Sequence, residues 1–214
     1  MSEQEEARVE YPEAMAPQLY LITPAAADPE TFPATLMGVL SAAEFSAILV
    51  QRGTLDAAGY AKLAAGVVNI GQGAGCAVLL HDDIALAKRL GADGVHITGG
   101  AKAIKDAVAA LKPGQIVGAG HIGTRHDAMT AGEMDLDYLL FGPLDGTSDP
   151  AAADLAEWWA ATFEIPAVLS DPGAVPGSAD SRGAEFLALS SSLWSAPAPA
   201  ALALAIADAV KETA

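Results

Sequence analysis

Short apolar runs alternate with longer stretches of helical spacing from residue 18 onward. Eight runs are apolar on both faces of an extended chain: 18–23, 45–50, 76–81, 94–97, 116–120, 138–142, 166–170 and 186–190. Such runs are typical of parallel strands that other elements cover on both sides. Ala, Leu and charged residues recur at helical spacing between them, at 30–43, 54–73, 83–91, 101–112, 124–132, 149–162 and 193–211, with only a poor helical turn near 173–182.

This alternation predicts an α/β fold, a (β/α)8 TIM barrel formed as a single domain by residues 18–214. Eight strand–helix units at a spacing of roughly 20–30 residues fit a closed barrel better than the alternative, an open doubly wound sheet. No stretch rich in Pro, Gly or Ser divides the pattern. We therefore expect one barrel domain.

Residues 1–17 differ from the rest and predict an acidic, flexible arm. This stretch contains five glutamates and one basic residue, Arg8. The stretch lacks the basic and apolar regions of a signal peptide, and the chain has no apolar run of the ~20 residues that a membrane helix needs. Its single cysteine, Cys76, lies among strand residues. These features predict a cytoplasmic protein that does not enter membranes.

The charge balance narrows the choice of partners. The chain has 11 Lys and Arg against 27 Asp and Glu, a formal net charge of −16. A field of that sign repels nucleic acid and anionic membranes, so we expect neither as a partner. A small phosphorylated ligand remains compatible, because backbone N–H groups can bind it locally. The sequence leaves the formation of a homo-oligomer open.

In barrels of this kind the chemistry lies at the carboxyl ends of the strands. Polar residues follow the predicted strands there: Thr23, Arg52, His81, Asp82, Asp83, Thr98, His121, residues 145–149, Asp171 and residues 190–192. We interpret Asp82 either as the N-cap of the next helix or as a metal or ligand contact. We expect His96, which lies within a strand, to be a satisfied core histidine.

Four segments resemble thiamine phosphate synthase and its relative, the thiazole tautomerase. They read "LYLIT" at 19–23, "HDDIALAKRLGADGVHI" at 81–97, "DYLLFGPLDGTS" at 137–148 and "GAEFLALSSSLW" at 183–194. The similarity covers most of residues 18–210. It implies thiamine metabolism and a transferase that joins a pyrimidine diphosphate to a thiazole phosphate with the help of Mg²⁺.

The resemblance also shows where this chain departs from the family. Arg52 matches the arginine after the second strand, but the family's following lysine is Thr54 here. Asp82 keeps one Mg²⁺ carboxylate, while Ala101 stands where the family has the second. Thr147 is kept after the sixth strand, but Pro150 replaces the lysine that binds the diphosphate. These departures predict a weakened Mg²⁺ site and make full synthase activity doubtful.

The thiazole-phosphate side is altered too. The family's Gly-Gly after the seventh strand is Asp171-Pro172 here, and proline has no N–H to donate to a phosphate. Ser191 matches the family's serine after the eighth strand. Serines 190–192 open the predicted last helix, where they could still bind an anion.

Three functions follow from these residues. The first is a divergent, thiamine-phosphate-synthase-like protein that binds a small thiazole- or pyrimidine-like or phosphorylated ligand at the barrel mouth. The second is a non-catalytic binding or regulatory barrel. The third is a recruited site for another divalent metal, used in hydrolysis and formed by His81, Asp82, His121 and Asp171. For the first function we expect His121 as the catalytic residue and Asp82 as the metal ligand. The expected ligand-binding residues are Arg52, His81, Thr147, Ser190, Ser191 and Ser192.

Overall fold

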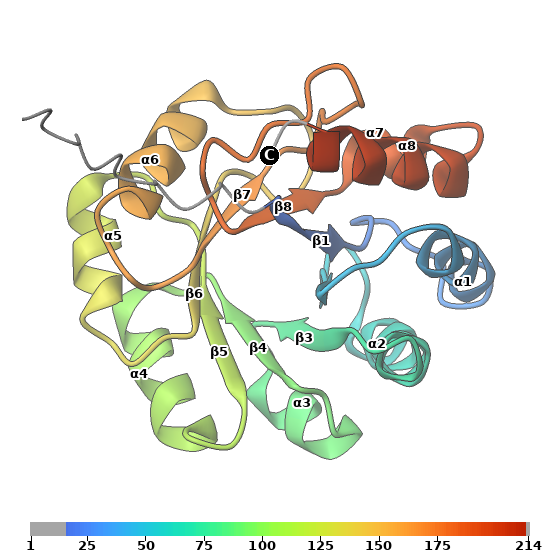
Figure 1. The fold of residues 1–214 in the computed structure, drawn as a ribbon. Coiled ribbons are helices and arrows are strands. Elements are labelled where there is room, and N and C mark those ends of the chain that lie inside the picture. Colours follow the sequence, from blue (N-terminus) through green and yellow to red (C-terminus); the bar gives the residue numbers. More distant parts are fainter. Residues whose placement is uncertain (1–15, 213–214) are drawn as a thin grey trace, which may run out of the picture.

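Eight parallel strands close into a barrel in the computed structural model, which describes residues 16–212. The strands are Gln18–Ile22 (β1), Ala47–Val50 (β2), Ala77–His81 (β3), Gly94–Ile97 (β4), Ile116–Ala119 (β5), Tyr138–Phe141 (β6), Ala167–Ser170 (β7) and Phe186–Leu189 (β8). Each pairs with its neighbours in sequence, and β1 also pairs with β8, with Leu21 opposite Leu189. The closed ring confirms the predicted barrel and excludes the open sheet (Figure 1).

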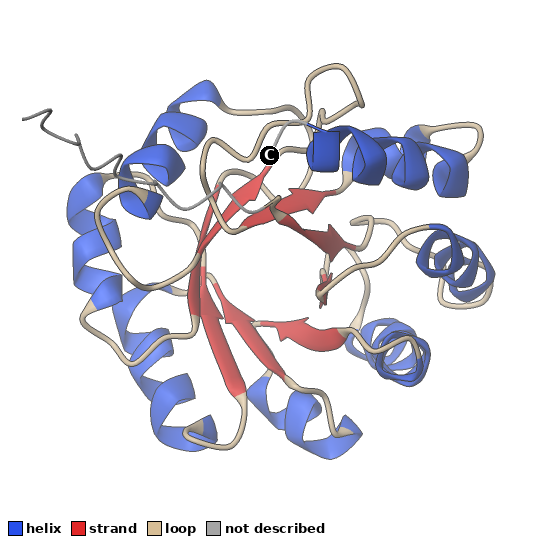
Figure 2. Cartoon of the chain, in the orientation of Figure 1, coloured by secondary structure: helices blue, strands red, loops and turns tan. Residues whose placement is uncertain are grey.

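Helices surround this ring on the outside (Figure 2). They are Phe32–Ala42 (α1), Ala57–Gly73 (α2), Ile84–Leu90 (α3), Gly100–Leu111 (α4), Arg125–Gly132 (α5), Pro150–Ala160 (α6), Ser191–Ser195 (α7) and Pro199–Glu212 (α8). The predicted arm falls almost entirely on residues 1–15, which lie outside the described part. No helix within 16–212 is long and apolar enough to cross a membrane.

The helical layer differs from the prediction in two places. The segment between β7 and β8 forms turns, and the poor helical turn expected near 173–182 does not form a helix. Pro172 and Pro176, each followed by glycine, explain this, because proline ends helical hydrogen bonding and glycine favours turns. The predicted last helix is two helices, since Pro197 and Pro199 separate α7 from α8.

The barrel separates two apolar clusters. The larger lies between strands and helices, and the smaller fills the barrel interior, where it includes Tyr20, Leu49, Leu79, Val168 and Ala188. Side chains alternate along a strand, so residues two positions further on face the same interior.

This alternation directs polar side chains inward at the carboxyl ends of several strands. The inward set comprises Gln51 after β2, His81 in β3, His96 in β4, Ser170 in β7 and Ser190 after β8. The mouth of the barrel is therefore lined by polar groups above an apolar floor.

Candidate functional site

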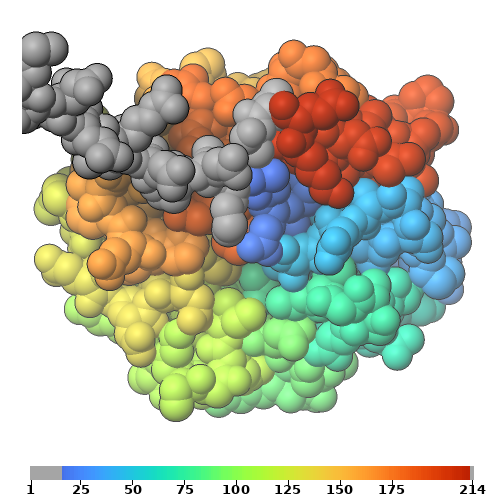
Figure 3. Space-filling view, viewed as in Figure 1, coloured from blue at the N-terminus to red at the C-terminus, as the bar shows by residue number. Residues whose placement is uncertain are grey.

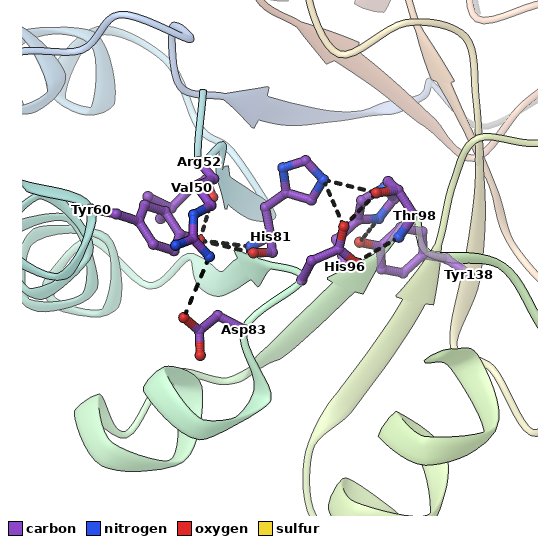
Figure 4. A network of polar contacts seen from close by, with 9 residues as sticks. Val50, Arg52, Tyr60, His81, Asp83, His96, Thr98 and Tyr138 are labelled. Carbon is purple, nitrogen blue, oxygen red and sulfur yellow. Dashed lines mark hydrogen bonds and ion pairs between the residues drawn. The ribbon is translucent and has the colours of Figure 1, made fainter. Parts of the chain in front are cut away.

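His81, Asp82 and Thr98 form a hydrogen-bonded cluster at the ends of β3 and β4 (Figure 4). The backbone N–H of Thr98 donates to Asp82 Oδ1 at 2.8 Å, and its hydroxyl donates to Asp82 Oδ2 at 2.5 Å. His81 Nε2 lies 3.1 Å from Thr98 Oγ1 and 3.3 Å from Asp82 Oδ2. Both carboxylate oxygens of Asp82 are thus engaged within the protein.

The backbone of Asp82 has the left-handed conformation, with φ of 50°. This conformation is uncommon for residues other than glycine, although aspartate tolerates it better than most. It turns the side chain toward β4 instead of the following helix. The N-cap of α3 is Asp83, whose side chain accepts the N–H of Leu86 at 2.9 Å. The N-cap interpretation of Asp82 was therefore wrong by one residue.

Hydrogen bonding keeps Asp82 charged. Burial alone would raise its pKa, but the hydrogen bonds from His81 and Thr98 outweigh burial and hold the pKa well below its usual range. The carboxylate therefore orients its neighbours within the cluster.

Arg52 lies at the mouth, where its guanidinium has two neighbours. Its guanidinium is 4.0 Å from Asp83 Oδ2 and lies 5.5 Å from the centre of the Tyr60 ring. The Tyr60 hydroxyl in turn accepts the N–H of His81 at 2.9 Å and donates to the carbonyl of Val50 at 3.0 Å. Tyr60, which sequence reasoning missed, thus joins the ends of β2 and β3 directly beneath Arg52.

A second polar chain crosses the barrel interior below this cluster. His96 Nδ1 lies 2.9 Å from the Tyr138 hydroxyl, which lies 3.0 Å from the Tyr20 hydroxyl. Burial lowers the pKa of His96 to about 3, and the nearby His81 contributes to the shift. His96 is therefore neutral, and it is only partly the satisfied core histidine that we expected, because its Nε2 has no partner.

Glycines in and directly after β5 make room for these three side chains. A Cβ atom at Gly118 would lie 2.0 Å from the Tyr138 ring, and one at Gly120 would lie 2.5 Å from His96 Nε2. Only glycine allows the rings to approach the strand this closely.

Several buried polar atoms in the inward set have no hydrogen-bond partner. Within residues 16–212, the buried side-chain atoms that lack a hydrogen-bond partner are Gln51 Oε1, His81 Nδ1, His96 Nε2 and Ser190 Oγ. All four belong to the inward set at the ends of β2, β3, β4 and β8. Buried polar groups are normally paired, so these atoms are candidates for contact with a ligand or ordered water.

On the opposite side of the mouth, hydrogen bonds connect α7 to the loops after β6 and β7. Ser191 Oγ accepts the N–H of Gly146 at 2.8 Å, which links α7 to the loop after β6. The N–H of Ser192 donates to Pro172 O at 2.7 Å, and its hydroxyl donates to Ala174 O at 2.7 Å. The Ser192 amide, which we had considered for anion binding, is therefore used within the fold. Thr147 is exposed in the same loop.

His121 follows β5 and is exposed, with a left-handed φ of 60°. Asp171, after β7, accepts a hydrogen bond from the Ser148 hydroxyl. No three His, Cys, Asp or Glu side chains of residues 16–212 lie together in a group that could hold a metal ion. The four-residue metal site predicted from His81, Asp82, His121 and Asp171 therefore does not form.

The same test applies to Mg²⁺. Both oxygens of Asp82 are engaged, and position 101 is an exposed alanine. Mg²⁺ is usually held through one or two carboxylates together with waters. The described residues at this position supply one carboxylate, Asp82, in place of the two that the resemblance implies.

Two cavities border the barrel. One of about 270 Å³ lies at the amino end of the barrel and is lined by Glu44, Phe45 and Cys76, among others. Cys76 is buried, as predicted, and burial, followed by the charge of Glu44, raises the pKa of its thiol. The other, of about 220 Å³, lies at the carboxyl end between α6 and the helix-free segment after β7, and its lining includes Ser148, Ser170 and Asp171. Neither contains any of the four unpartnered atoms.

Comparisons with known proteins agree with this architecture. The family model described as thiamine monophosphate synthase matches residues 19–170. Thiamine-phosphate synthase of Hyphomonas neptunium is 36% identical over 189 residues, covering 83% of this chain and 86% of the relative. The same enzyme of Rhodospirillum centenum is 36% identical over 198 residues, covering 88% of this chain and 94% of the relative.

Solved structures share the fold at lower identity. Thiamine phosphate pyrophosphorylase from Pyrococcus furiosus has a TM-score of 0.77 at 19% identity, covering 91% of this chain and 96% of that one. A 3-hexulose-6-phosphate synthase from Salmonella typhimurium has a TM-score of 0.71 at 18% identity, covering 92% of this chain and 100% of that one. These likenesses concern the barrel alone. The family match and the sequence identity to the relatives together show that the chain belongs to the thiamine monophosphate synthase family.

Proposed function

We propose that this protein binds a small thiazole- or pyrimidine-like, phosphorylated ligand at the carboxyl-end mouth of the barrel. We further propose that it is a divergent member of its family, with synthase turnover well below that of its relatives. Neutral polar groups of the inward set recognise the ring of the ligand, and Arg52 is the cation nearest to its phosphate.

The observation that carries the proposal is that four unpartnered polar atoms belong to inward residues near the carboxyl ends of β2, β3, β4 and β8. They include an amide oxygen, a hydroxyl and two imidazole nitrogens. A heteroaromatic ring with exocyclic polar groups offers donors and acceptors that match such a set. Leaving a buried polar atom unpaired costs ~1–3 kcal/mol, so a ligand that pairs several of them gains affinity.

Reduced turnover follows from the charges around the mouth. Arg52 is engaged by Asp83, and Thr54 and Pro150 replace two lysines that the family resemblance implies. Each charge-assisted contact to a diphosphate is worth ~1.5–3 kcal/mol, which corresponds to roughly ten- to hundredfold in rate. With Asp82 engaged by Thr98, the Mg²⁺ site is weakened as well.

Calorimetry and a product assay test the two parts separately. Calorimetry with thiazole phosphate and with pyrimidine diphosphate measures binding. Formation of thiamine phosphate with Mg²⁺ measures turnover, side by side with the Hyphomonas neptunium relative. We expect binding of at least one ligand, with kcat/KM at least about tenfold below that of the relative. Equal kcat/KM would refute the divergence, whereas binding without any turnover would favour the non-catalytic barrel.

A matched pair of variants locates the binding. Gln51→Leu removes a buried amide from the mouth, and Gln72→Leu makes the same change in α2, where the amide bonds to Gly91 and Asp93. We expect the Gln51 variant to lose about tenfold or more in affinity and the Gln72 variant to bind normally. Equal affinities in the two variants would place the ligand elsewhere.

A further inference from the structure

We infer that the loop after β6 is a strap that closes the mouth of the barrel and is held there by a hydrogen bond between Asp145 and Gln51. This loop, residues 142–149, is called the strap below. Its closure depends only on contacts within the chain. The further step, that the strap must open before a ligand enters, rests on the proposed function.

The strap reaches from one side of the mouth to the other. In the closed ring from β1 to β8, β2 and β6 are four strands apart in both directions, so they lie opposite each other. Gln51 directly follows β2, and Asp145 belongs to the strap after β6. Gln51 Nε2 donates to Asp145 Oδ2 at 3.1 Å. This hydrogen bond therefore connects opposite sides of the mouth.

The residue before Asp145 covers the apolar floor of the mouth. Leu144 is partly buried and packs against the interior cluster, and because it follows β6 it approaches the cluster from the carboxyl end. The space-filling view shows no open channel through the centre of the ring on the face that it presents (Figure 3). Leu144 thus buries apolar surface when the strap is closed, which favours the closed position.

The burial of polar side chains shows that the mouth is covered. Gln51 is 8% exposed, Ser170 is 2% exposed and Ser190 is 1% exposed, although they stand at the carboxyl ends of β2, β7 and β8. Polar residues at the rim of an open mouth are normally in contact with water. Gln51 Oε1 and Ser190 Oγ are also without a hydrogen-bond partner. Closure therefore removes these two atoms from water without replacing its hydrogen bonds.

The strap also contacts the other buried residues of the rim. The carbonyl of Pro143 accepts a hydrogen bond from the Ser170 hydroxyl at 2.6 Å. The N–H of Gly146 donates to Ser191 Oγ at 2.8 Å, directly beside Ser190 in the chain. These bonds fix the two ends of the strap, while its middle reaches across to β2.

Two glycines flank the middle of the strap. Gly142 has a φ of 104° and Gly146 a φ of 89°, which are conformations that favour glycine. A Cβ atom on Gly142 would lie 2.6 Å from the carbonyl oxygen of Ser170, so this position also requires close packing. Glycines change their backbone angles at little cost, so residues 143–145 can swing about these two positions.

The closed strap opposes a phosphorylated ligand in two ways. Asp145 occupies Nε2 of Gln51, so a ligand can bind this donor only after Asp145 has left. The carboxylate of Asp145 also repels a phosphate that approaches the mouth. Asp145 is exposed, so water competes for its carboxylate and the strap opens reversibly. The fraction of open molecules scales the apparent affinity for the ligand.

Thiol labelling measures the opening without any ligand. Ser190→Cys places a thiol at the buried rim, and labelling of the chain without this reporter corrects for Cys76, which is 4% exposed. With the uncharged reagent N-ethylmaleimide, we expect Asp145→Ala to label the reporter about fivefold faster or more. Asp145→Asn, which keeps an acceptor for Gln51, raises the rate less. Asp135→Ala removes an exposed acid before β6 and leaves the rate unchanged.

Hydrogen exchange gives a second reading on the chain without the reporter. The N–H of Gly146 exchanges earlier in Asp145→Ala than in the wild type, because it is bonded to Ser191 only while the strap is closed. Circular dichroism melts verify that each variant is folded. Labelling and exchange that are unchanged in Asp145→Ala, or equally faster in Asp135→Ala, overturn the strap.

Stopped-flow binding of thiazole phosphate and of pyrimidine diphosphate tests the admission of a ligand. We expect Asp145→Ala to raise the association rate constant about fivefold or more, and Asp145→Asn to raise it less. An equal gain in both variants would trace the effect to charge alone and overturn the gating by the hydrogen bond. If labelling shows opening but neither compound binds any variant, the proposed function fails and the strap stands. Binding at an unchanged rate in Asp145→Ala overturns the gating while the proposed function stands.

Discussion

The hydroxyl oxygens of Tyr20 and Tyr138 lie 3.0 Å apart inside the barrel, where both side chains are buried. The Tyr138 hydroxyl also lies 2.9 Å from Nδ1 of His96. Tyr138 therefore holds the middle position of three hydrogen-bonded side chains, and His96 Nε2 at one end has no partner.

The hydrogen bonds among Tyr20, Tyr138 and His96 predict unequal effects of two similar substitutions. Tyr138→Phe leaves both His96 and Tyr20 without their hydrogen-bond partner, whereas Tyr20→Phe leaves Tyr138 still bonded to His96. We expect Tyr20→Phe to lower the free energy of unfolding by ~1 kcal/mol and Tyr138→Phe to lower it by ~2 kcal/mol or more. Urea denaturation of both variants measures the difference. A larger loss in the Tyr20 variant would contradict the middle position of Tyr138.

The pH dependence of stability follows from His96. Its pKa is about 3 in the folded protein against an ordinary value of 6.5, so between these values the unfolded chain binds a proton that the folded chain does not. Stability conferred by the neutral imidazole is thus full above pH 6.5 and is lost as the pH falls toward 3, at ~1.4 kcal/mol per pH unit. Asp82, with its lowered pKa, adds a loss that begins as the pH falls through the ordinary value of 3.8.

Denaturation midpoints between pH 7 and pH 4 measure this effect. We expect His96→Asn to flatten the dependence, because asparagine keeps a polar atom for Tyr138 but does not titrate. The control is His126→Asn, an exposed residue of α5, and we expect it to behave like the wild type. If the two variants show the same slope, His96 is not the titrating group.

Magnesium is expected to have little effect on the resting protein, because Asp82 is a single carboxylate there and both of its oxygens already accept hydrogen bonds from Thr98. We expect a change of less than about 1 °C in the melting midpoint when millimolar Mg²⁺ or a chelator is added. Ala101→Asp supplies a second carboxylate at the start of α4 and should produce an upward shift with Mg²⁺. A clear shift in the wild type would mean that Thr98 gives way to the ion.

Restoring cations is expected to raise synthase turnover. The double variant Thr54→Lys and Pro150→Lys places a lysine at two exposed positions, one on the loop after β2 and one at the first residue of α6. Each gained contact with the diphosphate is expected to raise kcat/KM for thiamine phosphate formation roughly tenfold or more. Pro33→Lys with Thr35→Lys makes the same changes on α1 and controls for net charge. An equal gain in the control would show that long-range attraction alone is responsible.

The barrel could be predicted from sequence because its strands are apolar on both faces and its helices recur at regular intervals. The exception, between β7 and β8, follows from Pro172 and Pro176, whose effect on a weak helical pattern is hard to judge in advance. The closed ring depends on the pairing of β1 with β8, which no local pattern encodes.

The site was harder to predict. Asp82 and Asp83 are equally good N-caps by type, and only the left-handed backbone of Asp82 assigns the capping role to Asp83. The contact of Tyr20 with Tyr138 joins positions 118 residues apart, so it leaves no local signal. One signal was available. Tyr20 and Tyr138 have the inward parity of their strands, and polar groups at such positions need partners across the barrel.

The segment between β7 and β8 is the one connection on the outside of the ring that forms no helix in the described chain. Arg182, which bonds to Asp154 and Glu157 of α6, fastens this segment to the neighbouring helix through exposed ion pairs. Ion pairs in water weaken with salt, whereas helix packing does not. We therefore expect local opening of the native protein to begin in this segment. Amide protons around residues 172–185 should exchange with deuterium earlier than those of the helix-covered strands. High ionic strength should make this exchange earlier still.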